Sequence, residues 1–165
     1  MIQKKICMLG SYCVGKTSLV RRYVESIFSD KYHSTIGVKI DKRQVSVDGR
    51  EVTLLLWDVA GEEEKFKVPM SYVRGASGYL LVIDGTRPET LDNAFDLQER
   101  VEASIGAVPF VLVLNKVDLT EQWALEEDTL QGLEARGWPV IRSSALTGEG
   151  VEAAFDTLAR LILTK

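Results

Sequence analysis

The sequence has little of what a disulfide-stabilised, membrane-spanning or nucleic-acid-binding protein needs. Its 165 residues include two cysteines, Cys7 and Cys13, which lie close together in sequence and do not suggest a bridge. Such sparse cysteine fits a reducing compartment, so we expect a cytoplasmic protein. No apolar run is long enough to span a bilayer, and no terminal cysteine is present for prenylation, so we expect no direct membrane anchor. The net charge of −4, with interleaved signs, leaves no basic surface for nucleic acid.

The sequence does contain a phosphate-binding pattern near its N-terminus. The segment Gly10 to Thr17 has a glycine, four free positions and then Gly-Lys-Thr. An apolar run precedes it and a helical pattern follows, so the loop lies where a strand becomes a helix. The glycines let the backbone wrap around an anion, which the N–H groups and the helix dipole attract. We expect Lys16 to reach the β- and γ-phosphates and the Thr17 hydroxyl to bind Mg²⁺.

Short apolar runs alternate with helical patterns along the chain. The runs cover residues 6–9, 51–58, 79–84, 109–115 and 138–143, and the helical patterns cover 18–24, 89–105, 126–136 and 151–163. Residues 38–47 instead alternate apolar and polar side chains and turn at Asp48-Gly49, which predicts an antiparallel hairpin at a sheet edge. The sequence therefore predicts an α/β fold with a mostly parallel six-stranded sheet, one antiparallel edge strand and helices on both faces.

Polar loops that follow the predicted strands supply candidates for a magnesium and γ-phosphate site. Ligands of such sheets bind beyond the carboxyl ends of the strands. Asp58 ends a predicted strand there and is expected to hold Mg²⁺ directly or through water. Gly61 allows a close backbone approach, so its N–H group is a candidate contact for the γ-phosphate. Thr35, in the long polar connection of residues 26–37, is either a further Mg²⁺ ligand or an ordinary loop threonine.

The segment Asn115-Lys116-Val117-Asp118 predicts which base is bound. A carboxylate at Asp118 can accept from both N1–H and the N2 amine of guanine, whereas adenine offers an acceptor at N1 and no amine. We expect Asn115 to tie the loops together and reach N7, the Lys116 stem to cover one face of the base, and the Ala145 N–H to donate to O6. The pattern therefore favours a guanine nucleotide.

With these motifs in register, the chain resembles a Ras-superfamily small GTPase over essentially its whole length, and looks closest to the Rab and Ras branches. Residues 29–32, 34–37, 57–58, 72–76 and 144–148 look Rab-like. The resemblance implies a phosphate-loop NTPase fold of the Ras-like G-domain type, with residues 1–165 as a single domain that binds GTP or GDP and Mg²⁺. It places Phe28 on guanine, Thr35 in switch I as a magnesium ligand and Gly61 in switch II.

The expected site residues fall into three groups. The catalytic candidates are Lys16, Thr35, Gly61 and Glu62. The metal candidates are Thr17, Thr35 and Asp58. The nucleotide-binding candidates are Ser11, Tyr12, Cys13, Val14, Gly15, Lys16, Thr17, Ser18, Phe28, Asn115, Lys116, Asp118, Ser144, Ala145 and Leu146. In addition, Ile40, Trp57 and Tyr72 match the apolar triad through which Rab proteins meet effectors, although Trp57 and Tyr72 are equally well read as core or half-buried anchors.

The chain departs from the family pattern in three places. Glu62 stands where the family usually has the glutamine that orients the attacking water, and its charge near an anionic phosphate is an electrostatic cost. Tyr12 occupies a position that is small in many relatives and lies over the γ-phosphate. The lipidated tail of Rab proteins is missing, which a prokaryotic relative or a shortened chain would each explain.

We therefore interpret the chain as a GTP-binding switch with slow, Mg²⁺-dependent hydrolysis of GTP to GDP and phosphate. Its switch regions would bind partners in a nucleotide-dependent way, and the resemblance implies effectors, GTPase-activating proteins and exchange factors. A first alternative, motivated by Glu62 and Tyr12, is a GTP-binding scaffold with negligible hydrolysis. A second, an ATP-dependent phosphate-loop kinase, is disfavoured by residues 115–118. A homodimer is neither required nor excluded.

Overall fold

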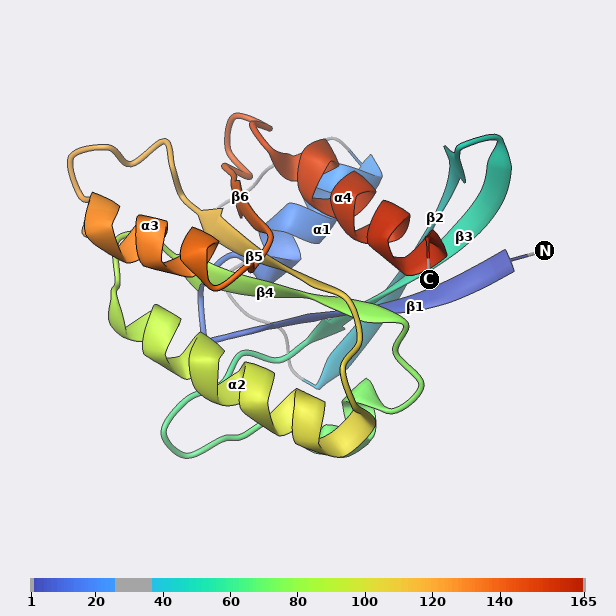
Figure 1. Cartoon of the computed structure of the whole chain (residues 1–165), viewed down its shortest axis with the longest axis horizontal. Helices are drawn as coiled ribbons and strands as arrows, with labels where there is room; N and C mark the ends of the chain where they lie inside the picture. Colours follow the sequence, from blue (N-terminus) through green and yellow to red (C-terminus); the bar gives the residue numbers. More distant parts are fainter. Residues whose placement is uncertain (1, 26–36, 165) are drawn as a thin grey trace.

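The computed structural model describes residues 2–25 and 37–164 and arranges them as one six-stranded sheet with helices on both faces (Figure 1). The elements are β1 (Ile2–Gly10), α1 (Lys16–Glu25), β2 (Val38–Val47), β3 (Arg50–Val59), the 3-10 helix η1 (Met70–Val73), β4 (Gly78–Asp84), α2 (Glu89–Ile105), β5 (Phe110–Asn115), α3 (Glu127–Ala135), β6 (Val140–Arg142) and α4 (Val151–Leu163).

The strands lie in the order β2-β3-β1-β4-β5-β6. Every neighbouring pair is parallel except β2 and β3, which form an antiparallel hairpin at one edge. The predicted fold class is therefore confirmed, including the antiparallel edge strand. Crossover helices cover both faces of the parallel part, as parallel strands require.

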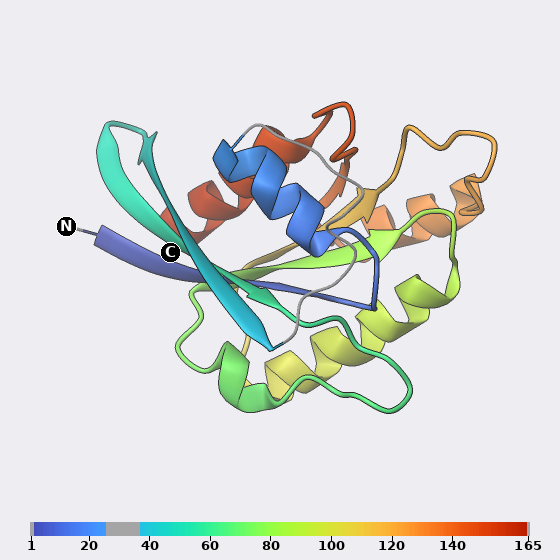
Figure 2. The same cartoon turned by 180° about the vertical axis from the view of Figure 1, so that it is seen from behind.

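Two apolar layers hold the sheet between its helices. Phe155 and Leu158 of α4 and Leu19 of α1 belong to the core layer on one face of the sheet. Leu97 of α2 and Leu133 of α3 belong to the layer on the opposite face. Figures 1 and 2 show these helix pairs on opposite sides of the strands. Because the central strands are covered twice, β4 is buried along its whole length.

Several element boundaries differ from those predicted. The predicted strand 138–143 contains only the three residues of β6, because Pro139 has no N–H group to donate to a sheet. The strand predicted at residues 6–9 begins four positions earlier in the structure, at Ile2, because its half-buried outer part pairs with β3. The short helix η1 was not predicted; it begins after Pro69, whose backbone is extended.

The two cysteines lie in very different surroundings. Cys7 is fully buried in β1, and burial raises the pKa of its thiol to about 11. Cys13 is half-buried in the loop after β1. Among the described residues, no helix combines the length and the apolar character needed to cross a bilayer.

Candidate functional site

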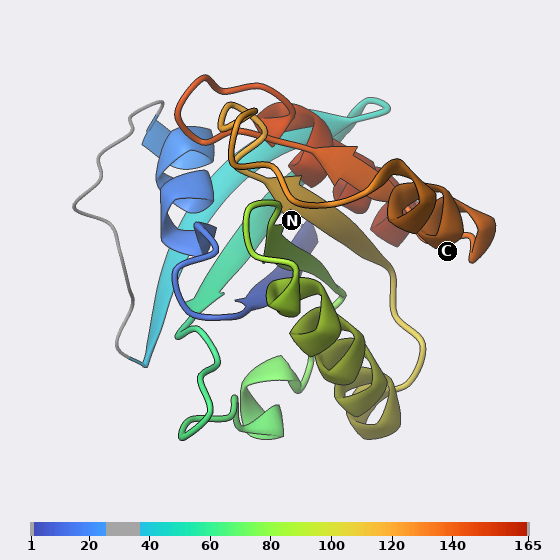
Figure 3. The same cartoon turned by 90° about the vertical axis from the view of Figure 1, so that its left-hand side faces the viewer.

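The loops after β1, β3, β4, β5 and β6 meet at one rim of the sheet, which Figure 3 shows facing the viewer. The phosphate-loop pattern runs from the last residue of β1, Gly10, into the first two residues of α1, Lys16 and Thr17, so it lies where a strand becomes a helix, as its sequence predicts. A Cβ atom on Gly10 would lie 2.4 Å from the Val82 carbonyl oxygen, and one on Gly15 would lie 2.2 Å from Asn115 Nδ2. Both glycines are therefore needed for close approach to the neighbouring strands.

Lys16 is buried at the start of α1 and turns back over the loop. Its ammonium group donates to the Ser11 carbonyl at 3.0 Å and lies 3.4 Å from the Gly10 carbonyl. Burial lowers the pKa of Lys16 to about 8, although the Asp58 carboxylate acts in the opposite sense. Because burial favours the neutral amine, an anion beside Lys16 would favour its protonated, charged form.

Thr17 and Asp58 form the oxygen pair that the sequence predicts for a metal. The Thr17 hydroxyl donates to Asp58 Oδ2 at 2.7 Å, which joins the start of α1 to the end of β3. A hydroxyl and a carboxylate are hard oxygen ligands of the kind that Mg²⁺ binds. These two residues therefore fit a magnesium site. The third predicted ligand, Thr35, lies outside the described residues, as does Phe28.

The loop predicted to recognise the base is connected directly to the phosphate loop. Asn115 Nδ2 donates to the Val14 carbonyl at 2.9 Å, and the Ser143 hydroxyl donates to Asn115 Oδ1 at 3.1 Å. Asp118 accepts a hydrogen bond from the Ser144 hydroxyl at 2.7 Å. These bonds unite the loops after β5 and β6 with the loop after β1. Of the neighbouring candidates, Ala145 is buried and Leu146 is exposed.

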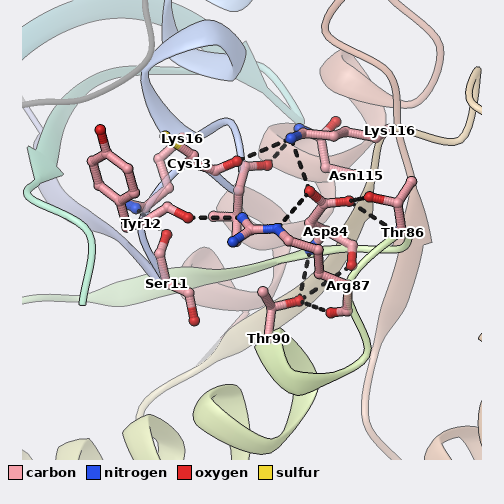
Figure 4. Close-up of polar contacts among 11 residues, drawn as sticks. Ser11, Tyr12, Cys13, Lys16, Asp84, Thr86, Arg87, Thr90, Asn115 and Lys116 are labelled. Atoms are coloured by element: carbon pink, nitrogen blue, oxygen red, sulfur yellow. Dashed lines mark hydrogen bonds and ion pairs between the residues drawn. The ribbon is translucent and has the colours of Figure 1, made fainter. Parts of the chain in front are cut away.

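A cluster of charges behind the phosphate loop was not predicted from the sequence (Figure 4). Asp84, buried at the end of β4, binds Lys116 Nζ at 2.8 Å and Arg87 Nε at 3.0 Å. Arg87 Nη2 also donates to the Tyr12 carbonyl at 2.7 Å. The rule that selected Asp58, a carboxylate at the end of a buried strand, also applies to Asp84. No sequence pattern indicates that Arg87 contacts the phosphate loop.

Glu62 is buried, and both of its carboxylate oxygens are engaged. Oε1 lies 2.5 Å from Arg100 Nη2 of α2, and Oε2 accepts the Val68 N–H at 2.7 Å. Its backbone bonds to the phosphate loop, with the N–H donating to Gly10 and the carbonyl accepting from Tyr12. Gly61, which precedes Glu62, also packs tightly against the phosphate loop, since a Cβ atom on Gly61 would lie 2.5 Å from the Tyr12 Cα.

The remaining predicted residues lie at the surface or near it. Tyr12 is exposed, while Ser11 and Cys13 are half-buried and Ser18 is buried. Ile40 is exposed and pairs with Trp57 across the β2–β3 hairpin. The ring of Trp57 is covered by Lys5 Nζ at 3.6 Å from its centre, and Tyr72 packs against the core layer under α2. The triad thus combines one exposed side chain with two half-buried ones.

Comparison with known proteins assigns this arrangement to a family. The sequence model described as the Ras family matches residues 5–164. Ras-related protein Rab-4 of Dictyostelium discoideum is 38% identical, over 98% of this chain and 80% of that protein. GTP-binding protein YPT1 of Saccharomyces cerevisiae is 36% identical, over 96% and 78%. The Ypt/Rab-type GTPase ypt7 of Schizosaccharomyces pombe is 38% identical, over 96% and 82%.

Proposed function

Because this chain belongs to the Ras family of small GTPases, we propose that it is a slow molecular switch whose two nucleotide states present different surfaces to partner proteins. As a member of that family it binds GTP or GDP with Mg²⁺ and hydrolyses GTP. Slow turnover, the roles of individual residues and the use of partners are the parts we propose. We also propose that residues 1–165 act as one G domain in the cytoplasm.

The observation that carries the proposal is the meeting of three motifs at one rim. Lys16 would hold the β- and γ-phosphates, Asp118 would accept from guanine, and Asn115 already joins the two loops through Val14. The Thr17 and Asp58 oxygens, which lie 2.7 Å apart, would hold Mg²⁺ together with Thr35. Bound Mg²⁺ would neutralise charge on the phosphates. These roles require no movement of the sheet.

The surroundings of Glu62 support slow hydrolysis. A residue that orients the attacking water needs an acceptor free to reach it, and in this protein Arg100 and the Val68 N–H occupy both carboxylate oxygens. Hydrolysis would then depend on positioning by Lys16, Gly61 and the metal. A partner that supplies an arginine would raise the rate by roughly 10³ to 10⁵. We therefore expect GTPase-activating and exchange factors, with effectors at the switch regions.

The test combines nucleotide content with phosphate release. Nucleotide is extracted from freshly purified protein, which is then reloaded with GTP and Mg²⁺ while free phosphate is followed for hours. We expect guanine nucleotide and slow phosphate release that Lys16→Ala abolishes, because that variant loses the cation at the phosphates. Glu62→Gln is measured in parallel to determine whether the residue takes part.

The alternative is a GTP-binding scaffold with negligible hydrolysis, which the paired state of Glu62 also favours. Recovery of intact GTP, with phosphate release no faster than from GTP alone in buffer, would support the scaffold and contradict a working switch. Recovery of adenine nucleotide would contradict both interpretations.

A further inference from the structure

Cys13 lies in the phosphate loop and has a backbone conformation that residues other than glycine rarely adopt. Its φ angle is +59°, in the left-handed region, where a residue with a Cβ atom is strained by about 1 kcal/mol or more. Such a conformation persists only when the surrounding structure holds the peptide groups on both sides of it. The two peptide groups concerned contain the carbonyls of Tyr12 and Cys13.

Each of these carbonyls is bound by a cation. The Tyr12 carbonyl accepts from Arg87 Nη2 at 2.7 Å, and the Cys13 carbonyl accepts from Lys116 Nζ at 3.0 Å. The next carbonyl, of Val14, accepts from Asn115 Nδ2 at 2.9 Å. Figure 4 shows Arg87 and Lys116 reaching the loop from the β4 and β5 ends. Three consecutive carbonyls are therefore held by three side chains.

These bonds also fix the direction of the N–H groups. A trans peptide is planar, so its C=O and the N–H of the following residue point in opposite directions. Because Arg87 binds the Tyr12 carbonyl, the N–H group of Cys13 points toward the opposite side of the loop. The bonds to the carbonyls of residues 13 and 14 do the same for the next two N–H groups. Phosphate loops bind their anion through such successive N–H groups.

The two cations are joined by the buried carboxylate of Asp84. Its Oδ2 atom lies 2.8 Å from Lys116 Nζ and 3.0 Å from Arg87 Nε, and its Oδ1 atom accepts from the backbone and hydroxyl of Thr86. Burial alone would raise the pKa of Asp84, but the bonds from Lys116, Thr86 and Arg87 hold it below its ordinary value. The carboxylate thus stays charged and keeps both cations in place.

We propose that Arg87 is a positioning residue for the nucleotide phosphates, which acts by holding the Tyr12–Cys13 peptide from behind the loop with its guanidinium oriented by Asp84. It is not a catalytic residue, because its contact is with a loop carbonyl. The inference rests on the binding of guanine nucleotide by this loop. It assigns to the segment after β4 a role that the known sequence motifs do not cover.

The experiment measures release of fluorescently labelled GDP from Mg²⁺-loaded protein. We expect Arg87→Ala to release GDP about tenfold faster, since it loses charge-assisted hydrogen bonds that keep the loop in its binding conformation. Arg87→Lys, which retains a donor cation, should recover much of the loss. Arg160→Ala is the matched control, because Arg160, like Arg87, binds two acceptors through its guanidinium but lies on the exposed face of α4, where both acceptors are the carboxylates of Asp48 and Asp156. Its release rate should equal that of the wild type.

Single-turnover hydrolysis by GTP-loaded protein separates positioning from catalysis. Arg87→Ala should change this rate by less than about threefold once the nucleotide is bound, because the guanidinium does not act on the reacting atoms. Release by Arg87→Ala at the wild-type rate would overturn the inference. So would a hundredfold loss of hydrolysis with unchanged release, which would make Arg87 an arginine finger. Wild-type protein that retained no GDP would instead overturn the nucleotide site itself.

Discussion

At the scale of single residues, Glu62 connects three parts of the chain through one side chain and its own backbone. Its side chain is 1% exposed and binds Arg100 of α2, while its backbone pairs with the phosphate loop. Arg100 is in turn held by Asp96 at 2.9 Å, one turn earlier on the same helix. The pair thus attaches the segment after β3 to α2, and the bond to Glu62 raises the pKa of Arg100.

Removal of Arg100 should destabilise the protein strongly. Arg100→Ala leaves a buried carboxylate without its cation, so we expect the free energy of unfolding to fall by about 2 to 4 kcal/mol. Urea denaturation of GDP-bound protein measures the change. Asp96→Ala should cost below about 1 kcal/mol, because that carboxylate is exposed and leaves the Glu62 pair intact. Equal losses for the two variants would show that the buried pair contributes no more than a surface one.

The two arginines that were not predicted share one property: each binds a carboxylate nearby on its own segment and also reaches a partner that is distant in sequence. Arg100 lies 38 positions from Glu62, and Arg87 lies 75 positions from Tyr12. The phosphate loop and the Asn-Lys-x-Asp segment were predictable because ligand chemistry fixes their local spacing. No local spacing links an arginine of α2 to a glutamate after β3. Such pairs exist only after the sheet has brought the two segments together.

At the scale of elements, α1 and α4 are joined by an aromatic pair on one face of the sheet. The rings of Tyr23 and Phe155 stack with their centres 4.0 Å apart and their planes within 7°. Phe155 is fully buried. Gly78 of β4 lets α4 approach the sheet, since a Cβ atom there would lie 3.0 Å or less from Leu158 and Ile162. This packing holds the first helix, and with it the phosphate loop, against the strands.

Truncation of Phe155 should be among the most damaging core changes. Phe155→Ala removes a buried ring and leaves a cavity, so we expect a loss of about 3 to 5 kcal/mol in the free energy of unfolding. Phe155→Leu, which keeps most of the apolar volume, should lose less than half as much. Leu161→Ala on the same helix, where the side chain is half-buried, serves as the comparison. A Phe155→Ala loss no larger than that of Leu161→Ala would contradict the importance of the stacked pair.

The elements themselves were predictable where burial imposes a clear pattern. β4 and β5 are apolar on both faces because helices cover them twice, and the alternating residues of β2 mark an edge strand. The shortness of β6 and the presence of η1 were not predicted. Both depend on prolines and on contacts with neighbouring segments, which the apolar pattern does not record.

At the scale of the whole molecule, one ligand would touch loops from both halves of the sheet. Stabilisation by such a ligand follows its free concentration relative to its dissociation constant, and reaches about 2.7 kcal/mol at a hundredfold excess. A nucleotide that spans the loops after β1, β3 and β5 would therefore stabilise the entire fold rather than one segment.

Removal of magnesium should weaken this stabilisation. We expect an excess of EDTA to speed GDP release at least tenfold and to lower the melting temperature of GDP-bound protein by about 5 °C or more. Thermal unfolding with and without EDTA measures the shift. Asp58→Ala should melt at the same temperature in both conditions, because it lacks a proposed metal ligand. A wild-type melting temperature that EDTA does not change would contradict a structural contribution from the metal.

The contrast between the two cysteines has a practical consequence. Cys7 is closed off in the core with its thiol pKa raised to about 11, whereas Cys13 is partly open to solvent within the phosphate loop. The thiolate form of an accessible cysteine is the nucleophile that attacks alkylating reagents. A fluorophore maleimide would therefore attach at Cys13 alone, so the native chain can carry a spectroscopic reporter on its phosphate loop without any engineered cysteine.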